Sequence, residues 1–243
     1  MKEIFRRPHI ANPALDGRLR IAQDLATSIQ NQVVNPAIHY PATLAVLVVT
    51  VTVSILAFRD QAMMERWMFK PREILAGKQF ERLLTSGFLH ADWMHLGFNM
   101  LSLYMFGKSV EDAYVNMFDE KGILFYILLY VGGLAMSSLY SYERNKGNMY
   151  YNALGASGAV SAVIYSYIMI APMNTLKFMF IPIDIPAYIF GFVYLGIEYY
   201  LSKKGNTGIA HDAHFWGAIY GVVLTIMIKP HAVSSFIDKI TGG

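Results

Sequence analysis

The 243-residue chain contains no cysteine and few charged residues. The absence of cysteine excludes disulfides, thiol catalysis and thiolate metal sites, although it does not identify a redox compartment. Only 15% of the residues are charged, whereas soluble domains usually approach about 25%. Because 55% of the residues are hydrophobic, the chain has more apolar surface than a soluble domain would need, which indicates a membrane protein.

The chain also lacks clusters of basic residues. Its formal charge is +3, and the lysines and arginines are scattered between apolar runs, so we expect a lipid bilayer and no nucleic acid as partner. Residues 1–40 lack the continuous apolar segment of a secretory signal peptide and predict a water-side leader. The sequence does not indicate an oligomeric state.

Six apolar runs predict six transmembrane helices and an all-α membrane protein. The runs cover residues 40–58, 93–107, 122–142, 147–172, 186–202 and 211–228. The fourth helix should end before Ala171-Pro172, because proline cannot continue it.

The segments between these runs are expected to differ in character. Between the first two helices, residues 59–82 mix charges with aromatic residues, so we expect an ordered, partly buried loop at the membrane interface. Residues 178–184 are interrupted by proline and read as a linker, and residues 231–243 as a short polar tail after a membrane domain at 41–230. Lysine and arginine are divided evenly between the two sides, so their distribution alone does not orient the chain.

Five polar side chains lie near the starts of three even-numbered helices. His95 and Asn99 are in the second, Ser157 in the fourth, and His211 and His214 in the sixth. Helices two, four and six begin on the same side of the membrane, so these groups should lie at one depth. Intramembrane polar groups are costly and usually face an interior or a water-filled cavity.

A serine and a histidine at one depth can act as nucleophile and general base. Donors four residues apart on a third helix can stabilise an oxyanion. Each feature alone also has a structural interpretation, since small-residue patterns and an intramembrane asparagine commonly pack membrane helices together. A combination of all of them is much less expected by chance. Asp212 cannot orient His214, because residues two apart on a helix point in different directions.

Three motifs carry a family resemblance. They are His95-Leu96-Gly97-Phe98-Asn99, Gly155-Ala156-Ser157-Gly158, and the segment from Ala213 to Gly221, which contains His214 and Gly217. In this order and on these helices, they resemble the HxxxN, GxSG and AHxxGxxxG motifs of the rhomboids, a family of intramembrane serine proteases. The resemblance covers roughly residues 41–229.

The resemblance implies a six-helix rhomboid bundle with a cytoplasmic N-terminus in the cell membrane and an active site open to the outer side. It implies an endopeptidase in which Ser157 is the nucleophile and His214 the general base. The oxyanion would be held at Ser157 by His95 and Asn99, with glycines in supporting roles at Gly155, Gly158, Gly217 and Gly221. Substrates would be single-span or multi-span membrane proteins cleaved near the outer face.

No metal or cofactor is expected, because the histidines lack a carboxylate or cysteine partner at ligand spacing. The connector at residues 205–208 would serve as a lid over the site. Two other classes remain open: a catalytically inactive rhomboid-like protein that binds membrane clients, and a small transporter, which would be expected to show an internal repeat.

Three positions depart from the family pattern or from the chemistry expected of it. The first loop carries Glu81-Arg82 where the family commonly has Trp-Arg, and Ser161 stands where some members have an aromatic residue. Glu198 lies near the outer end of the fifth apolar run. We expect its side chain to reach toward water near Lys203 or Lys204 rather than to act in substrate access.

Overall fold

The computed structural model describes residues 40–178, 181–204 and 209–242, and helices predominate among them. The leader expected at residues 1–40 lies outside the described residues apart from Tyr40. The connector at residues 205–208 also lies outside them, so its role as a lid stays a prediction.

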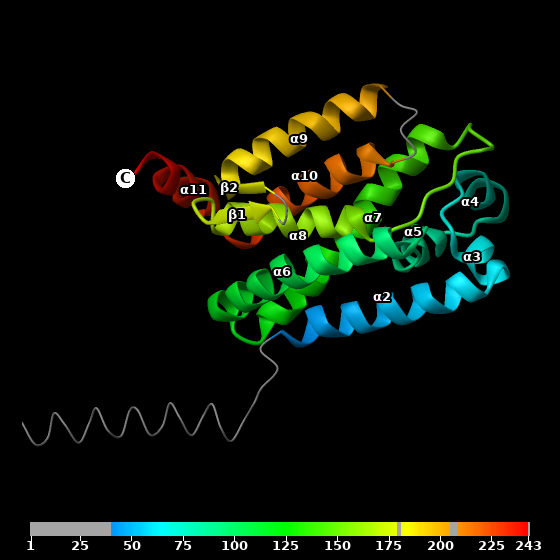
Figure 1. Ribbon diagram of the computed structural model, residues 1–243, viewed down its shortest axis with the longest axis horizontal. Coiled ribbons are helices and arrows are strands. Elements are labelled where there is room, and N and C mark those ends of the chain that lie inside the picture. Colours follow the sequence, from blue (N-terminus) through cyan, green and yellow to red (C-terminus); the bar gives the residue numbers. More distant parts are fainter. Residues whose placement is uncertain (1–39, 179–180, 205–208, 243) are drawn as a thin grey trace, which may run out of the picture. The chain divides into compact units, whose positions relative to one another are not determined.

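Among the described residues, six long helices correspond to the six predicted runs. They are α2 (Pro41–Arg59), α6 (Trp93–Phe118), α7 (Lys121–Asn145), α8 (Ser157–Ile170), α9 (Ala187–Lys204) and α10 (His211–Ile228). Figure 1 shows α8 between α6 and α10, with α2 and α9 at opposite edges. The starts of α6, α8 and α10 lie at one end of this bundle, as the alternation of helix directions requires.

By length and apolar composition alone, two of the described helices could cross a membrane, α2 and α7. A third candidate is α10 taken together with α11 (Ala232–Thr241), although the two helices meet at a bend of 106°. Helix α8 is apolar but shorter. The chain is therefore a helical protein with two to three candidate membrane spans among its described residues.

Two helix boundaries differ from the prediction. Helix α6 continues past Gly107 to Phe118, because the charged residue Glu111 finds buried partners there. Helix α8 begins at Ser157 rather than near Gly147, while its end at Ile170 agrees with the prediction. The later start of α8 places the serine in its first turn.

The loop between α2 and α6 is ordered around an internal arginine. It contains α3 (Gln61–Trp67), α4 (Pro71–Gly77), α5 (Arg82–Thr85) and the 3-10 helix η1 (Ser86–Phe88). The buried Arg82 guanidinium donates to the carbonyls of Glu65 and Met68, at 2.9 and 2.7 Å, and to the Gln79 side chain. The arginine of the Glu81-Arg82 pair therefore holds the loop from inside.

Two segments differ from the sequence-based expectation at the other end of the bundle (Figure 1). The predicted linker forms an antiparallel hairpin of β1 (Thr175–Phe178) and β2 (Ile181–Pro186), because its short extended segments pair with one another. The predicted polar tail contains α11, whose Lys239 ammonium donates to the carbonyl of Ile170 at 2.7 Å. Both elements therefore close the end where α8 finishes.

Small residues bring α8 and α10 into backbone contact. A Cβ added at Gly217 would lie 2.1 Å from the carbonyl oxygen of Gly158, and one added at Gly221 would lie 2.2 Å from that of Ala162. Any side chain at these positions would push the helices apart. The predicted packing role of the α10 glycines therefore has a direct geometric basis.

A carboxylate on α6 caps the start of α2. The buried Glu111 accepts from the backbone N–H groups of Ala42 and Thr43, at 2.8 and 2.7 Å, and from the Thr43 hydroxyl at 2.6 Å. These two N–H groups belong to the first turn of α2, and the N–H groups of a helix's first turn have no hydrogen-bond acceptors within their own helix. The negative charge also complements the positive end of the helix dipole.

We expect Glu111→Gln to lower the free energy of unfolding by about 2 kcal/mol, because a charge-assisted acceptor becomes a neutral amide whose NH₂ faces other donors. The thermal unfolding midpoint in detergent should fall by several degrees. Asp112→Asn, at the exposed neighbouring position, is the matched control. Equal midpoints for Glu111→Gln and the unaltered protein would contradict the capping role.

His90 is a buried member of the loop just before α6. Its Nδ1 lies 2.9 Å from the Ser54 hydroxyl, while its Nε2 has no hydrogen-bond partner among the described residues. Burial, with a smaller contribution from neighbouring His95, lowers the pKa of His90 from 6.5 to about 3. The folded chain therefore holds this imidazole in its neutral form.

The depressed pKa of His90 predicts a stability that depends on pH. Above pH 6.5 the imidazole is neutral in both the folded and the unfolded chain, so its protonation does not affect stability. Below pH 6.5 the unfolded chain binds a proton that the folded chain does not, which favours unfolding. Stability should therefore fall as the pH drops from 6.5 toward 3, by up to about 1.4 kcal/mol per pH unit.

Unfolding midpoints at pH 7.5, 6.5 and 5.5 test this dependence. His90→Gln should flatten the decline, while His231→Gln, at an exposed position, should leave it unchanged. An equally steep decline in the unaltered protein and in His90→Gln would show that other groups cause it.

Candidate active site

Ser157 is the first residue of α8, and the chain leading into it is held by the first loop. Phe69 and Ala153 exchange two backbone hydrogen bonds of 3.0 and 3.1 Å, and the Gly155 N–H donates to the Ser86 carbonyl at 3.0 Å. Gly155 has φ +124°, a backbone conformation that favours glycine. The chain therefore turns sharply just before Ser157, and α8 begins at this residue.

His214 reaches this serine from the first turn of α10. Its Nε2 lies 2.7 Å from the Ser157 hydroxyl oxygen, although the two residues are 57 positions apart in the sequence. Both side chains are partly buried. This is the hydrogen-bonded geometry that a nucleophile and its general base require.

Glu198 differs from its predicted orientation. It is buried on α9, with its carboxylate oxygens 3.1 Å from His214 Nδ1 and 2.6 Å from His211 Nδ1. The expectation that it reaches toward water near Lys203 or Lys204 is wrong, because these histidines offer the carboxylate buried hydrogen-bond partners. The structure thus lines up Ser157, His214 and Glu198.

The same cluster contradicts the reason given for expecting no metal. One possible ligand atom from each of Glu198, His211 and His214 lies within 4.8 Å of the others, so the histidines do have a carboxylate partner. Two ligands at about 2.05 Å from a tetrahedral zinc ion are about 3.3 Å apart. The 2.6 Å separation between Glu198 and His211 is shorter and fits a direct hydrogen bond. As described, the arrangement is that of a hydrogen-bonded cluster.

Of the two residues expected to bind an oxyanion, His95 lies against the turn that precedes the serine, and neither residue hydrogen-bonds to Ser157 among the described residues. A Cβ added at Gly155 would be 2.9 Å from His95 Nε2, so the imidazole rests against the turn that precedes Ser157. The Asn99 amide nitrogen donates to the His95 carbonyl at 3.0 Å on its own helix. That amide has a second N–H, which this bond leaves available.

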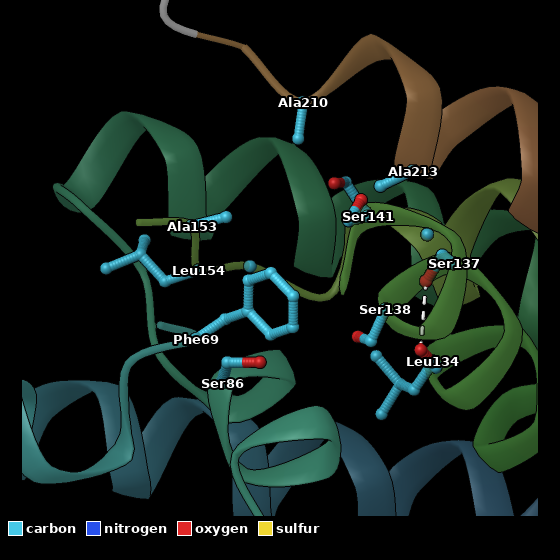
Figure 2. A pocket seen from close by; sticks show the side chains of 13 residues that line it. Phe69, Ser86, Leu134, Ser137, Ser138, Ser141, Ala153, Leu154, Ala210 and Ala213 are labelled. Atoms are coloured by element: carbon cyan, nitrogen blue, oxygen red, sulfur yellow. Dashed lines mark hydrogen bonds between the residues drawn. The ribbon is translucent and has the colours of Figure 1, made fainter. Parts of the chain in front are cut away.

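A small cavity of about 40 Å³ lies beside the serine. Figure 2 shows Ser138 and Ser141 of α7, Phe69 and Ser86 of the loop, and Ala210 around it; Ser157 also lines it. Such a volume holds ordered water or a small side chain. Sequence reasoning missed the serines of α7, although three of them, Ser137, Ser138 and Ser141, recur within one short stretch of an otherwise apolar helix.

A tyrosine of α9 also contacts His214. The hydroxyl of Tyr194 lies 3.5 Å from His214 Nδ1, and an aromatic residue four positions before Glu198 was a signal for it. Ser161 of α8, where some family members have an aromatic residue, is buried. Asp212 forms a 3.4 Å hydrogen bond with Ser141 of α7, consistent with the expectation that it does not orient His214.

Comparison with known proteins identifies the family of the chain. A family model described as the rhomboid domain matches residues 77–231. RHOMBOID-like protein 12, mitochondrial, from Arabidopsis thaliana is 29% identical over 182 residues, which are 71% of this chain and 53% of the plant protein. The chain thus spans about half the length of that relative. Because the domain match covers most of the chain and includes all three motifs, the chain belongs to the rhomboid family.

Proposed function

We propose that the chain is an intramembrane serine endopeptidase that cleaves transmembrane segments of other membrane proteins. The observation that carries this proposal is the 2.7 Å contact between Ser157 Oγ and His214 Nε2, formed by the first turns of two helices in backbone contact. An inactive rhomboid-like protein would not need to keep both groups in this geometry.

The reaction begins when the Ser157 hydroxyl oxygen attacks the carbonyl carbon of a peptide bond. Its proton passes to His214 Nε2, which then delivers it to the leaving amine. Water subsequently attacks the acyl carbon of the acyl-enzyme while His214 Nε2 takes a proton from it. The bond between the acyl carbon and Ser157 Oγ then breaks, His214 delivers that proton to Oγ, and the carboxylic acid product leaves.

The negative charge that develops on the substrate oxygen needs donors close to Ser157. The first turn of α8 supplies backbone N–H groups and the positive end of the helix dipole. Imidazole and amide donors come from His95 and from the second N–H of Asn99. A preorganised donor of this kind contributes about 3 kcal/mol to transition-state stabilisation.

The membrane arrangement belongs to the same proposal. Six helices would cross the bilayer, with a cytoplasmic N-terminus and the starts of α6, α8 and α10 near the outer face. There water reaches Ser157, and the small cavity beside it favours small residues in the substrate. Substrate segments with glycine, alanine or proline would unwind most readily, which exposes their carbonyls to attack.

Two indications point to different cellular membranes for the chain. The family resemblance favours a multi-pass location in the cell membrane, whereas the plant relative carries a mitochondrial name. Membrane fractionation of cells that express the tagged chain distinguishes these locations.

The test is cleavage of a model substrate by the purified full chain in liposomes. The substrate is a single-span protein with an alanine- and glycine-containing segment near one membrane face, and products are identified by mass spectrometry. A fluorophosphonate should label Ser157, and Ser157→Ala should remain unlabelled. Binding of the substrate without cleavage or labelling would instead support the inactive client-binding class.

A further inference from the structure

Glu198 is an isolated charge in an apolar helix. The stretch of α9 from Ala187 to Ser202 contains no other charged residue, and Glu198 is buried at 5% exposure. A buried carboxylate is costly unless it is paired, and acidic residues within membrane segments usually have functional partners. The partners of Glu198 therefore indicate its role.

Both oxygens of the carboxylate are occupied by histidines of α10. One oxygen lies 3.1 Å from Nδ1 of His214, and the other lies 2.6 Å from Nδ1 of His211. His211 is itself buried, and one turn of helix separates it from His214. The shorter contact to His211 fixes the carboxylate, so that its other oxygen faces the general base.

The Glu198 contact selects the form of His214 that the reaction needs. A neutral imidazole carries one proton, and a carboxylate at Nδ1 favours that proton on Nδ1. The lone pair then lies on Nε2, which faces the Ser157 hydroxyl at 2.7 Å. When His214 accepts the serine proton on Nε2, the resulting positive charge is already beside the negative carboxylate.

We propose that Glu198 is the positioning residue of a Ser157–His214–Glu198 triad and that His211 holds its carboxylate in place. This proposal rests on the proposed function and extends it by a third member. During the attack the proton moves from Ser157 Oγ to His214 Nε2, the Nδ1–H stays on His214, and Glu198 remains ionised. The acid comes from α9, a helix that contains neither the nucleophile nor the base.

The experiment measures kcat and KM of the full chain and of Glu198→Gln on the same liposome substrate, together with the rate of fluorophosphonate labelling. Glutamine keeps the size of the side chain but lets its NH₂ face His214, which favours the wrong tautomer. We expect kcat and the labelling rate to fall by a factor on the order of 10²–10⁴. KM should change less than twofold, since Glu198 has no contact with substrate in the proposed mechanism.

The controls separate this role from a structural one. Glu143→Gln changes an exposed glutamate of α7 and should leave kcat unchanged. Glu198→Gln should keep an unfolding midpoint close to that of the unaltered protein. If it does not fold, His211→Gln is the second variant, and its kcat should fall about tenfold because Glu198 loses the partner that holds it.

Three results would overturn the proposal. The first is a kcat for Glu198→Gln within threefold of the unaltered value, and the second is a loss confined to KM. The third is inactivation by EDTA with bound zinc in the purified protein, which would make the cluster a metal site. If the unaltered chain neither cleaves nor becomes labelled, the proposed function itself fails, and that outcome is distinct from a failure of the triad alone.

Discussion

Replacing Ser157 with alanine is expected to lower the cleavage rate by a factor on the order of 10⁴ or more, and His214→Ala should have a comparable effect. The two groups share one proton over a 2.7 Å contact, so neither can perform its step without the other. The double variant should therefore be no slower than either single variant. Cleavage rates in liposomes, measured with excess enzyme and one turnover, test this non-additivity.

Matched controls come from exposed residues of the same types. Ser234 and His231 lie at the C-terminal end of the described chain and are exposed, so Ser234→Ala and His231→Ala should retain the rate of the unaltered protein. Residual cleavage by Ser157→Ala above about one per cent would exclude its hydroxyl as the nucleophile. Multiplicative losses in the double variant would show that the two residues act independently.

Gly217→Ala is expected to lower activity by about a hundredfold or more, although Gly217 contacts no reacting atom. The added methyl carbon would lie 2.1 Å from the carbonyl oxygen of Gly158, which is backbone and cannot rotate away. The helices α8 and α10 must separate, and Ser157 separates from His214 with them. Misplacement of reacting groups by about 1 Å can reduce a rate a hundredfold, and overpacking costs about 1–3 kcal/mol of stability.

Gly196→Ala is the control, because a Cβ at this position of α9 meets nothing within 4 Å. Both glycines lie inside helices, so the intrinsic helix propensity changes equally in the two variants. The cleavage rate of Gly196→Ala should stay close to that of the unaltered chain, and its unfolding midpoint should not fall. If Gly217→Ala behaves in the same way, the close approach of α8 and α10 does not hold the site together.

The sequence contains enough information for the helices and for the central pair of the site. Apolar runs locate the six helices, and the alternation of their directions predicts that Ser157 and His214 lie at one depth. The prediction of the start of α8 fails by about ten residues. The uncharged segment 147–156 can form either helix or loop, and its hydrogen bonds to the first loop decide for loop.

The role of Glu198 could not be predicted for a physical reason. A carboxylate close to a helix end can extend into water at little cost, and the apolar pattern of α9 does not reveal the rotation of that helix about its axis. The structure shows that this rotation turns Glu198 and Tyr194 toward His214. The α7 serines that line the cavity were missed for the same reason, because tertiary packing determines which side of α7 faces the cavity.

The order of the site residues along the chain bears on the synthesis of the protein. Ser157 precedes His214 by 57 residues, and the interacting Glu198 also lies before His214. During translation the nucleophile would therefore reach the membrane well before its base. Under the proposed function, a nascent chain that ends after α9 would have an unactivated serine, so newly inserted helices nearby would be safe from cleavage until α10 packs against α8.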